Sequence, residues 1–203
     1  MVIGSGPNGL AAAITLAQAG RSVLVIEGQE TIGGGTRSAE LTLPGFVHDV
    51  CSAVHPMAVI SPFFRKLPLE QHGLTWIQPP IPLAHPLDDG SAVVLMRSVD
   101  ETAARLGKDA AAYKQIFNRL VDDWPRLESL LLGMTRVPRH PFAAGFFGLL
   151  SLRSAHGFAE AHFRREQSRA LFAGMAAHSM LPLERLPTAA FGLVLALTGH
   201  VAG

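Results

Sequence analysis

The sequence VIGSGPNGLA, residues 2–11, joins a short apolar run to a helical pattern through a glycine-rich turn. Its glycines fit the spacing G-x-G-x-x-G, in which the first permits a tight turn, the second lets a pyrophosphate approach the backbone, and the third allows close packing of helix and strand. The amides and the positive dipole end of the helix would hold the pyrophosphate. We therefore predict that a dinucleotide contacts Gly4, Ser5, Gly6, Pro7, Asn8 and Gly9.

The residues after this turn complete a βαβ pattern. Apolar residues recur at helical spacing up to Gly20, and residues 23–26 are a continuous apolar run typical of a parallel strand. Glu27 follows this strand 23 positions after Gly4, where a carboxylate can accept hydrogen bonds from an adenosine ribose. A carboxylate would repel a 2′-phosphate, so an ADP-containing cofactor without that phosphate is favoured. The alternative is a glycine-rich turn with a solvated acid.

A second glycine motif lies six to eight residues after the acid. Gly33, Gly34 and Gly35 are consecutive, and Arg37 follows them closely. Three glycines cost backbone entropy, which indicates close backbone approach to a ligand, and an arginine could donate to a phosphate. A flexible surface loop is the alternative interpretation. The motif favours FAD over NAD, since a nicotinamide enzyme would need the turn and Glu27 but not the triple glycine.

Length and composition favour a protein that binds a small molecule. The 203 residues carry 17 basic and 16 acidic side chains, so nucleic acid is not an expected partner. One cysteine and the absence of a secretory pattern lead us to predict a cytoplasmic location. The apolar segments 142–152 and 189–197 are too short to span a bilayer, although peripheral contact with a membrane stays open. The oligomeric state is not predicted.

The chain beyond residue 66 reads as a hairpin followed by helices. Asp88, Asp89 and Gly90 form a turn before an extended segment, 92–96. Ser98 and Glu101 predict a capping box, and Asp109 could cap a helix that reaches about residue 132. Three further helices are expected over residues 142–152, 158–180 and 188–198.

A cluster of polar residues between these parts contains candidate ligands. His48, Cys51 and His55 could share a helix face, and Asp49 lies beside them. We predict no metal site, because the paired spacing of zinc ligands is missing. Roles near a cofactor and roles in capping turns are equally open for these side chains, so no catalytic residue is assigned.

Residues 2–38 resemble the FAD-binding start of the glutathione-reductase-2 group of flavoproteins, and in particular the phytoene desaturase (phytoene dehydrogenase)-like oxidoreductases. The segments PGFVHDVCSAVHP, PLAHPLDDGSAVVLMRS and AGMAAHSMLPL resemble the same proteins more loosely. The resemblance implies an α/β fold in which a Rossmann-like βαβ FAD-binding unit, residues 1–66, precedes an incomplete, largely helical α+β substrate domain, residues 67–203. Many relatives have arginine where this chain has Gly35.

The resemblance implies an FAD-dependent oxidoreductase that moves a hydride from an apolar substrate to flavin N5. Such proteins are usually more than twice as long, so this chain is expected to be an N-terminal fragment that binds FAD weakly or not at all and shows no turnover. Two alternatives are an NAD-dependent dehydrogenase and a non-catalytic interaction module on a degenerate nucleotide-binding fold.

Overall fold

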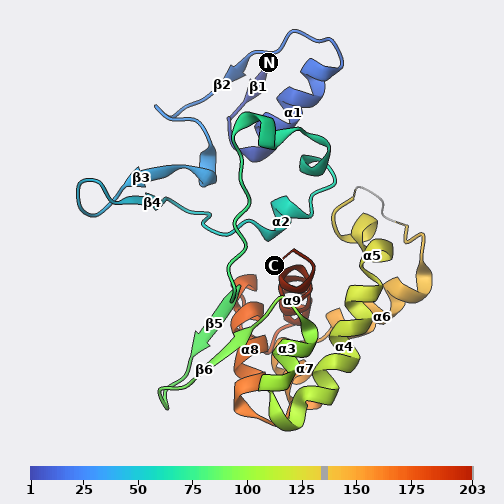
Figure 1. Ribbon diagram of the computed structural model, residues 1–203. Coiled ribbons are helices and arrows are strands. Elements are labelled where there is room, and N and C mark those ends of the chain that lie inside the picture. Colours follow the sequence, from blue (N-terminus) through green and yellow to red (C-terminus); the bar gives the residue numbers. More distant parts are fainter. Residues whose placement is uncertain (134–136, 203) are drawn as a thin grey trace. The chain divides into compact units, whose positions relative to one another are not determined.

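The computed structural model describes residues 1–133 and 137–202 (Figure 1). The chain divides into two compact units, Met1–His55 and Pro56–Gly203. Each unit is described by itself below. The domain boundary expected after residue 66 lies within the second unit, just past a short helix, α2 (Pro56–Val59), and a 3₁₀ turn, Phe64–Lys66.

The first unit begins with the predicted βαβ arrangement. Strands β1 (Val2–Ile3) and β2 (Val25–Ile26) pair in parallel, and helix α1 (Pro7–Gln18) connects them. The helix ends where the sequence predicts it, because Gly20 adopts a left-handed φ of +73° and its amide donates to the carbonyl of Ala17. The fold class, a Rossmann-like α/β unit followed by helices, is confirmed.

A hairpin that the sequence analysis did not predict completes the first unit. Strands β3 (Ser38–Glu40) and β4 (Val47–Asp49) pair antiparallel. The turn between them contains Gly45, whose φ of +84° suits glycine. The helix face that His48, Cys51 and His55 could have shared does not form, since His48 lies on β4.

The first unit buries little. Ser5 and Ala13 are its buried residues, whereas Ile3, Leu24 and Ile26 on and beside the parallel strands are 79%, 61% and 44% exposed. Two short strands and one helix cannot enclose an apolar core. The geometry of this unit therefore depends on glycine contacts and hydrogen bonds more than on apolar packing.

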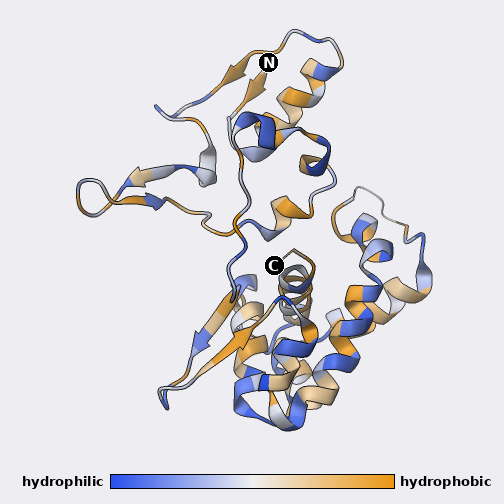
Figure 2. Ribbon diagram, viewed as in Figure 1, coloured by the Kyte–Doolittle hydropathy of each residue, from blue (hydrophilic) through white to orange (hydrophobic). Residues whose placement is uncertain are grey.

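The second unit contains the predicted hairpin and seven longer helices among its described residues. Strands β5 (Leu83–Pro86) and β6 (Ala92–Leu95) pair antiparallel, and β6 is the strongly apolar strand in Figure 2. The helices are α3 (Val99–Arg105), α4 (Ala110–Asp122), α5 (Trp124–Leu131), α6 (Pro141–Ser151), α7 (Ala155–His162), α8 (Glu166–Ala176) and α9 (Thr188–Ala202). The predicted cap at Ser98 is confirmed, because its Oγ accepts from the amide of Glu101.

Two segments predicted as continuous helices are each divided. Residues 109–132 break at Asp123, where α5 begins at Trp124 with Pro125, which has no amide hydrogen, in its first turn. Residues 158–180 break between α7 and α8, where Phe163 and Arg165 are extended. At the second break, a distant side chain accepts hydrogen bonds from the amides before α8, which helix periodicity does not reveal.

That distant side chain is Asp109, which is 2% exposed. Its two carboxylate oxygens accept hydrogen bonds from the amides of Arg164 and Arg165, at 2.9 and 2.8 Å. Burial opposes ionisation, but these amides hold the pKa of Asp109 below its usual value. The side chain does not cap α4 as the sequence analysis predicts; it joins α4 to α8 instead.

Helix α9 lies at the centre of the core of the second unit. Its Leu193 and Leu197 are fully buried, and Gly192 leaves room for the ring of Phe172 on α8. Phe172 stacks on Phe158 of α7, with ring centroids 4.4 Å apart. Three helices thus meet at one aromatic contact.

A buried hydrogen-bonded pair links α4 to α9 inside this core. The Nδ1–H of His200 donates to the carbonyl of Arg97 at 3.0 Å, which leaves Nε2 to accept from the hydroxyl of Tyr113 at 2.8 Å. Burial lowers the pKa of His200 and raises the pKa of Tyr113. The neutral imidazole is therefore the form that the folded chain favours.

Replacing Asp109 by Asn should destabilise the second unit by about 1–2 kcal/mol, because one of the two charge-assisted caps of α8 is lost. The free energy of unfolding, measured by urea denaturation, tests this. The matched control is Asp122→Asn, an exposed change on α4 that should stay within about 0.5 kcal/mol. Equal effects of the two changes would contradict the capping role.

The folded chain should lose stability as the pH falls below about 6.5, the ordinary pKa of histidine. The unfolded state then binds a proton that buried His200 takes up only at lower pH. Denaturation midpoints measured at about pH 7.5 and 5.5 should differ less in His200→Gln than in the unchanged chain. An unchanged difference would show that other groups cause the loss.

Candidate dinucleotide-binding site

The glycine-rich turn has the close contacts that its sequence predicts. Gly4 adopts a φ of +92°, and its amide donates to the carbonyl of Ile26 at 2.7 Å. A Cβ on Gly9 would lie 2.0 Å from the carbonyl oxygen of Gly4. Only glycine fits at that position, because α1 passes directly over the turn.

Helix α1 opens without a side-chain cap. Its N-cap is Gly6, and Pro7 occupies the first turn without an amide hydrogen. The amides of Asn8 and Gly9 therefore begin the helix at its positive dipole end with no side-chain acceptor. An anionic group is the ligand that such a terminus favours.

Glu27 points at this turn. Its Oε2 accepts from both the amide and the hydroxyl of Ser5, at 2.8 and 2.6 Å. Its Oε1 accepts from the amides of Gly28 and Gln29, at 2.8 and 3.0 Å. The two residues that the sequence separates by 22 positions are thus joined at the end of the parallel strand pair.

These four donors favour the ionised carboxylate. The Ser5 hydroxyl and the Ser5 amide contribute most, and together the donors lower the pKa of Glu27 to about 2. Glu27 is therefore a carboxylate throughout the physiological pH range. It can accept hydrogen bonds from a hydroxyl, and it repels a phosphate.

The triple-glycine bend lies against the same turn. The amide of Gly33 donates to the carbonyl and to the hydroxyl of Ser5, at 3.2 and 3.3 Å. The Cα of Gly6 would lie 2.9 Å from a Cβ on Gly34, whose φ is +57°. Glycine is required there for both space and conformation. The structure thus brings the turn, the acid and the bend together.

The remaining two predicted residues lie at the far side of the bend. Arg37 donates from Nε to the carbonyl of Gly34 at 2.9 Å, which holds the guanidinium beside the bend. Gly35 approaches Cys51, since a Cβ there would lie 3.8 Å from its sulfur. Arg37 is placed to donate from its terminal nitrogens beyond the loop.

The polar cluster near the hairpin makes local contacts. His48 pairs with Thr42 at 2.7 Å, Asp49 accepts from the Ser38 hydroxyl at 2.8 Å, and His55 faces Ser52 at 3.4 Å. Within residues 1–133 and 137–202, no three metal-ligating side chains lie close enough to hold an ion. None of these contacts assigns a catalytic role.

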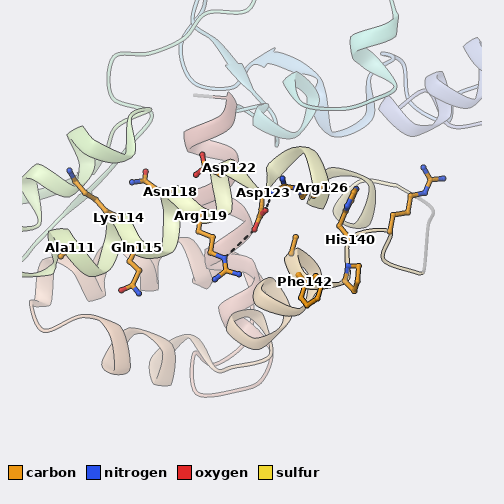
Figure 3. Close-up of a pocket in the computed structure, with 13 residues that line it drawn as sticks. Ala111, Lys114, Gln115, Asn118, Arg119, Asp122, Asp123, Arg126, His140 and Phe142 are labelled. Atoms are coloured by element: carbon orange, nitrogen blue, oxygen red, sulfur yellow. Dashed lines mark hydrogen bonds and ion pairs between the residues drawn. The ribbon is translucent and has the colours of Figure 1, made fainter.

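Sequence reasoning missed a pocket of about 1000 Å³ in the second unit (Figure 3). It lies among α4, α5 and the start of α6. Asp123 pairs there with Arg126 at 2.6 Å and with Arg119 at 3.9 Å. The spacing of these three residues, i, i+4 and i+7, could have predicted that they lie on one helical face and pair with one another. The three side chains are engaged with one another, so their arrangement assigns no catalytic role.

Comparison with known proteins agrees with the geometry of the first unit. The model of the NAD(P)-binding Rossmann-like domain matches residues 2–67. One of the subunits of limonene dehydrogenase from Castellaniella defragrans is 31% identical over 121 residues, which cover 58% of this chain and 22% of that protein. The family match thus falls on the first unit and the start of the second.

Solved structures of putrescine oxidase share the fold. A triple mutant redesigned at its cofactor site is 20% identical and has a TM-score of 0.56, covering 98% of this chain and 42% of that one. The wild type bound to putrescine is 22% identical, with a TM-score of 0.54, 99% coverage of this chain and 42% of that one. The chain spans less than half the length of these relatives, and its residues 2–67 match the NAD(P)-binding Rossmann-like domain in sequence.

Replacing Gly34 by Ala should displace the bend, because the new Cβ would meet the Gly6 backbone and the left-handed conformation would be strained. We expect amide exchange at Gly33 to accelerate by about fivefold or more, which corresponds to about 1 kcal/mol. Hydrogen exchange followed by NMR measures this. The control is Gly28→Ala, since no atom lies within 4 Å of a Cβ there. Equal exchange rates in both variants would contradict the close contact.

Proposed function

We propose that this chain supplies the dinucleotide-binding part of an FAD-dependent oxidoreductase that takes a hydride from an apolar substrate. The observation that carries the proposal is the contact of two glycine motifs around one acid. Gly34 lies against Gly6, and the Ser5 hydroxyl donates to Glu27 and accepts from the amide of Gly33. One extended ligand that carries an ADP group would touch all three.

The residues present fit the ADP half of such a ligand. The amides of Asn8 and Gly9 would hold the pyrophosphate at the start of α1, and Arg37 would donate to it from the bend. Glu27 would accept from a ribose hydroxyl. Its oxygens already accept from four donors, so the Ser5 hydroxyl would have to yield its place.

FAD would supply the redox chemistry, which is hydride acceptance at flavin N5. The part of this chain is to bind the cofactor and orient it, which needs few acids or bases. This division of labour accounts for the lack of an assigned catalytic residue. The chain covers 22% of the limonene dehydrogenase subunit and 42% of putrescine oxidase.

An apolar substrate is the choice that the stronger sequence relative supports. Limonene is a hydrocarbon, and the chain is 31% identical to part of a dehydrogenase named for it. Putrescine is a cationic diamine, but the oxidase that binds it is only 20–22% identical and supports the fold alone. The narrower resemblance to phytoene dehydrogenases and the cytoplasmic location stay predictions.

An NAD-dependent dehydrogenase is the second candidate, since the matched family model is named for NAD(P). The contact between Gly34 and Gly6 favours FAD, because binding of a nicotinamide cofactor would not need the triple-glycine bend. A non-catalytic interaction module would bind neither cofactor. The visible absorbance of the purified protein separates flavin from the other two.

Glu27→Gln should weaken binding of ADP and of FAD by about tenfold, because a charge-assisted hydrogen bond to the ribose is lost. Calorimetric titration of the 203-residue chain measures this, and the unchanged chain should bind FAD weakly. Affinity should not vary between about pH 4 and pH 8 through Glu27, since its pKa is about 2. The control is Glu30→Gln, an exposed acid three residues later. Equal binding by both variants would overturn the assigned role of Glu27.

A further inference from the structure

Helix α6 is apolar on its outer face as well as on its inner face. Ala143 and Phe147 face the core, whereas Phe142, Leu149 and Leu152 are 90%, 77% and 70% exposed. With Gly145, which has open space around it, these three form one row at spacings of three, four and three residues. Figure 2 shows α6 in mostly apolar colours along its length. We call Phe142, Gly145, Leu149 and Leu152 the α6 outer row.

The sequence around this row is depleted of negative charge. No Asp or Glu occurs from residue 129 to residue 159, although that stretch contains three arginines. Arg139 and His140 are exposed directly before α6. Arg153, after its last turn, is half-buried and donates to the carbonyl of Gly157 at 3.1 Å. Figure 3 shows His140 and Phe142 together beside the pocket. The whole chain is nearly neutral, so this local excess of cations is a property of the α6 region.

From these observations we propose that the α6 outer row is a docking surface for an anionic lipid bilayer. The Phe142, Leu149 and Leu152 side chains would enter the boundary between headgroups and acyl chains, where an apolar helix face is stabilised. Arg139, which is exposed at the start of the helix, would meet the phosphates. The surface is independent of the dinucleotide site and of the function proposed for it.

The shape and area of the row favour a bilayer over a second copy of the chain. Its three large side chains expose on the order of 400 Å², below the roughly 800 Å² per partner of a stable protein interface. A bilayer needs neither a large area nor a matching shape.

Among the described residues, no helix is both long and apolar enough to cross a bilayer. The longest, α9 (Thr188–Ala202), contributes nine buried residues to its unit. The contact that we propose is therefore peripheral, with α6 lying along the membrane surface and the rest of its unit outside the hydrocarbon.

Flotation of the 203-residue chain with lipid vesicles tests the proposal. The chain should bind vesicles of phosphatidylcholine mixed with phosphatidylglycerol, and binding should fall by about tenfold with phosphatidylcholine alone. Phe142→Ser combined with Leu149→Ser should reduce binding to the mixed vesicles by about tenfold or more. Its control combines Ile77→Ser with Met180→Ser, which removes side chains that are 86% and 89% exposed elsewhere. The control should bind like the unchanged chain.

A second pair of variants tests the contribution of Arg139 to vesicle binding. Arg139→Glu should weaken binding severalfold more than Arg21→Glu, which changes the net charge equally at an exposed site after α1. A fluorescent variant tests the proposal even if the serine variant unfolds. The tryptophan emission of Phe142→Trp should shift to shorter wavelength when the mixed vesicles are added. Unshifted emission, or serine variants that bind equally, would overturn the proposal. Light scattering that shows a dimer dissociated by Phe142→Ser would assign the row to a second copy and overturn it as well.

Discussion

The hydrogen bonds between Glu27 and Ser5 are the interaction on which the first unit depends. They join the end of β2 to the turn between β1 and α1, and Ser5 in turn holds the amide of Gly33. Burial alone could not fix these segments, because Ser5 and Ala13 are the buried residues of the unit. Charge-assisted hydrogen bonds and glycine contacts therefore define the geometry that a dinucleotide would meet.

The second unit is stabilised by different physics. Phe158 and Phe172 stack in a core that α9 crosses, and Asp109 satisfies the helix start that the break after α7 leaves open. Substitutions in this unit should therefore destabilise it when they change the volume of a buried side chain or remove the partner of a buried polar group. The two units thus respond to different kinds of mutation, although both belong to one chain.

The sequence predicted the parts whose cause is local. The spacing of Gly4, Gly6 and Gly9 is enough to predict the tight turn. The position of Glu27 near that turn follows because one helix and one strand of ordinary length separate the two in the sequence. The hairpin of β3 and β4 was not predicted, because each strand has only three, mostly exposed residues, too few to show an alternating apolar pattern. The role of Asp109 escaped because its partners lie 55 and 56 residues away, beyond the reach of any capping motif.

The candidate site itself shows the same division between local and distant causes. The sequence spacing alone placed Glu27 near the turn. It could not predict that the Ser5 hydroxyl donates to the Glu27 carboxylate, which only the structure shows. That hydroxyl donates to Glu27 and accepts from the Gly33 amide. A ribose hydroxyl that replaced it at the carboxylate would remove the restraint that orients Ser5 toward the bend. Binding at the adenosine end would thereby bear on the position of Gly34, the residue that lies closest to Gly6.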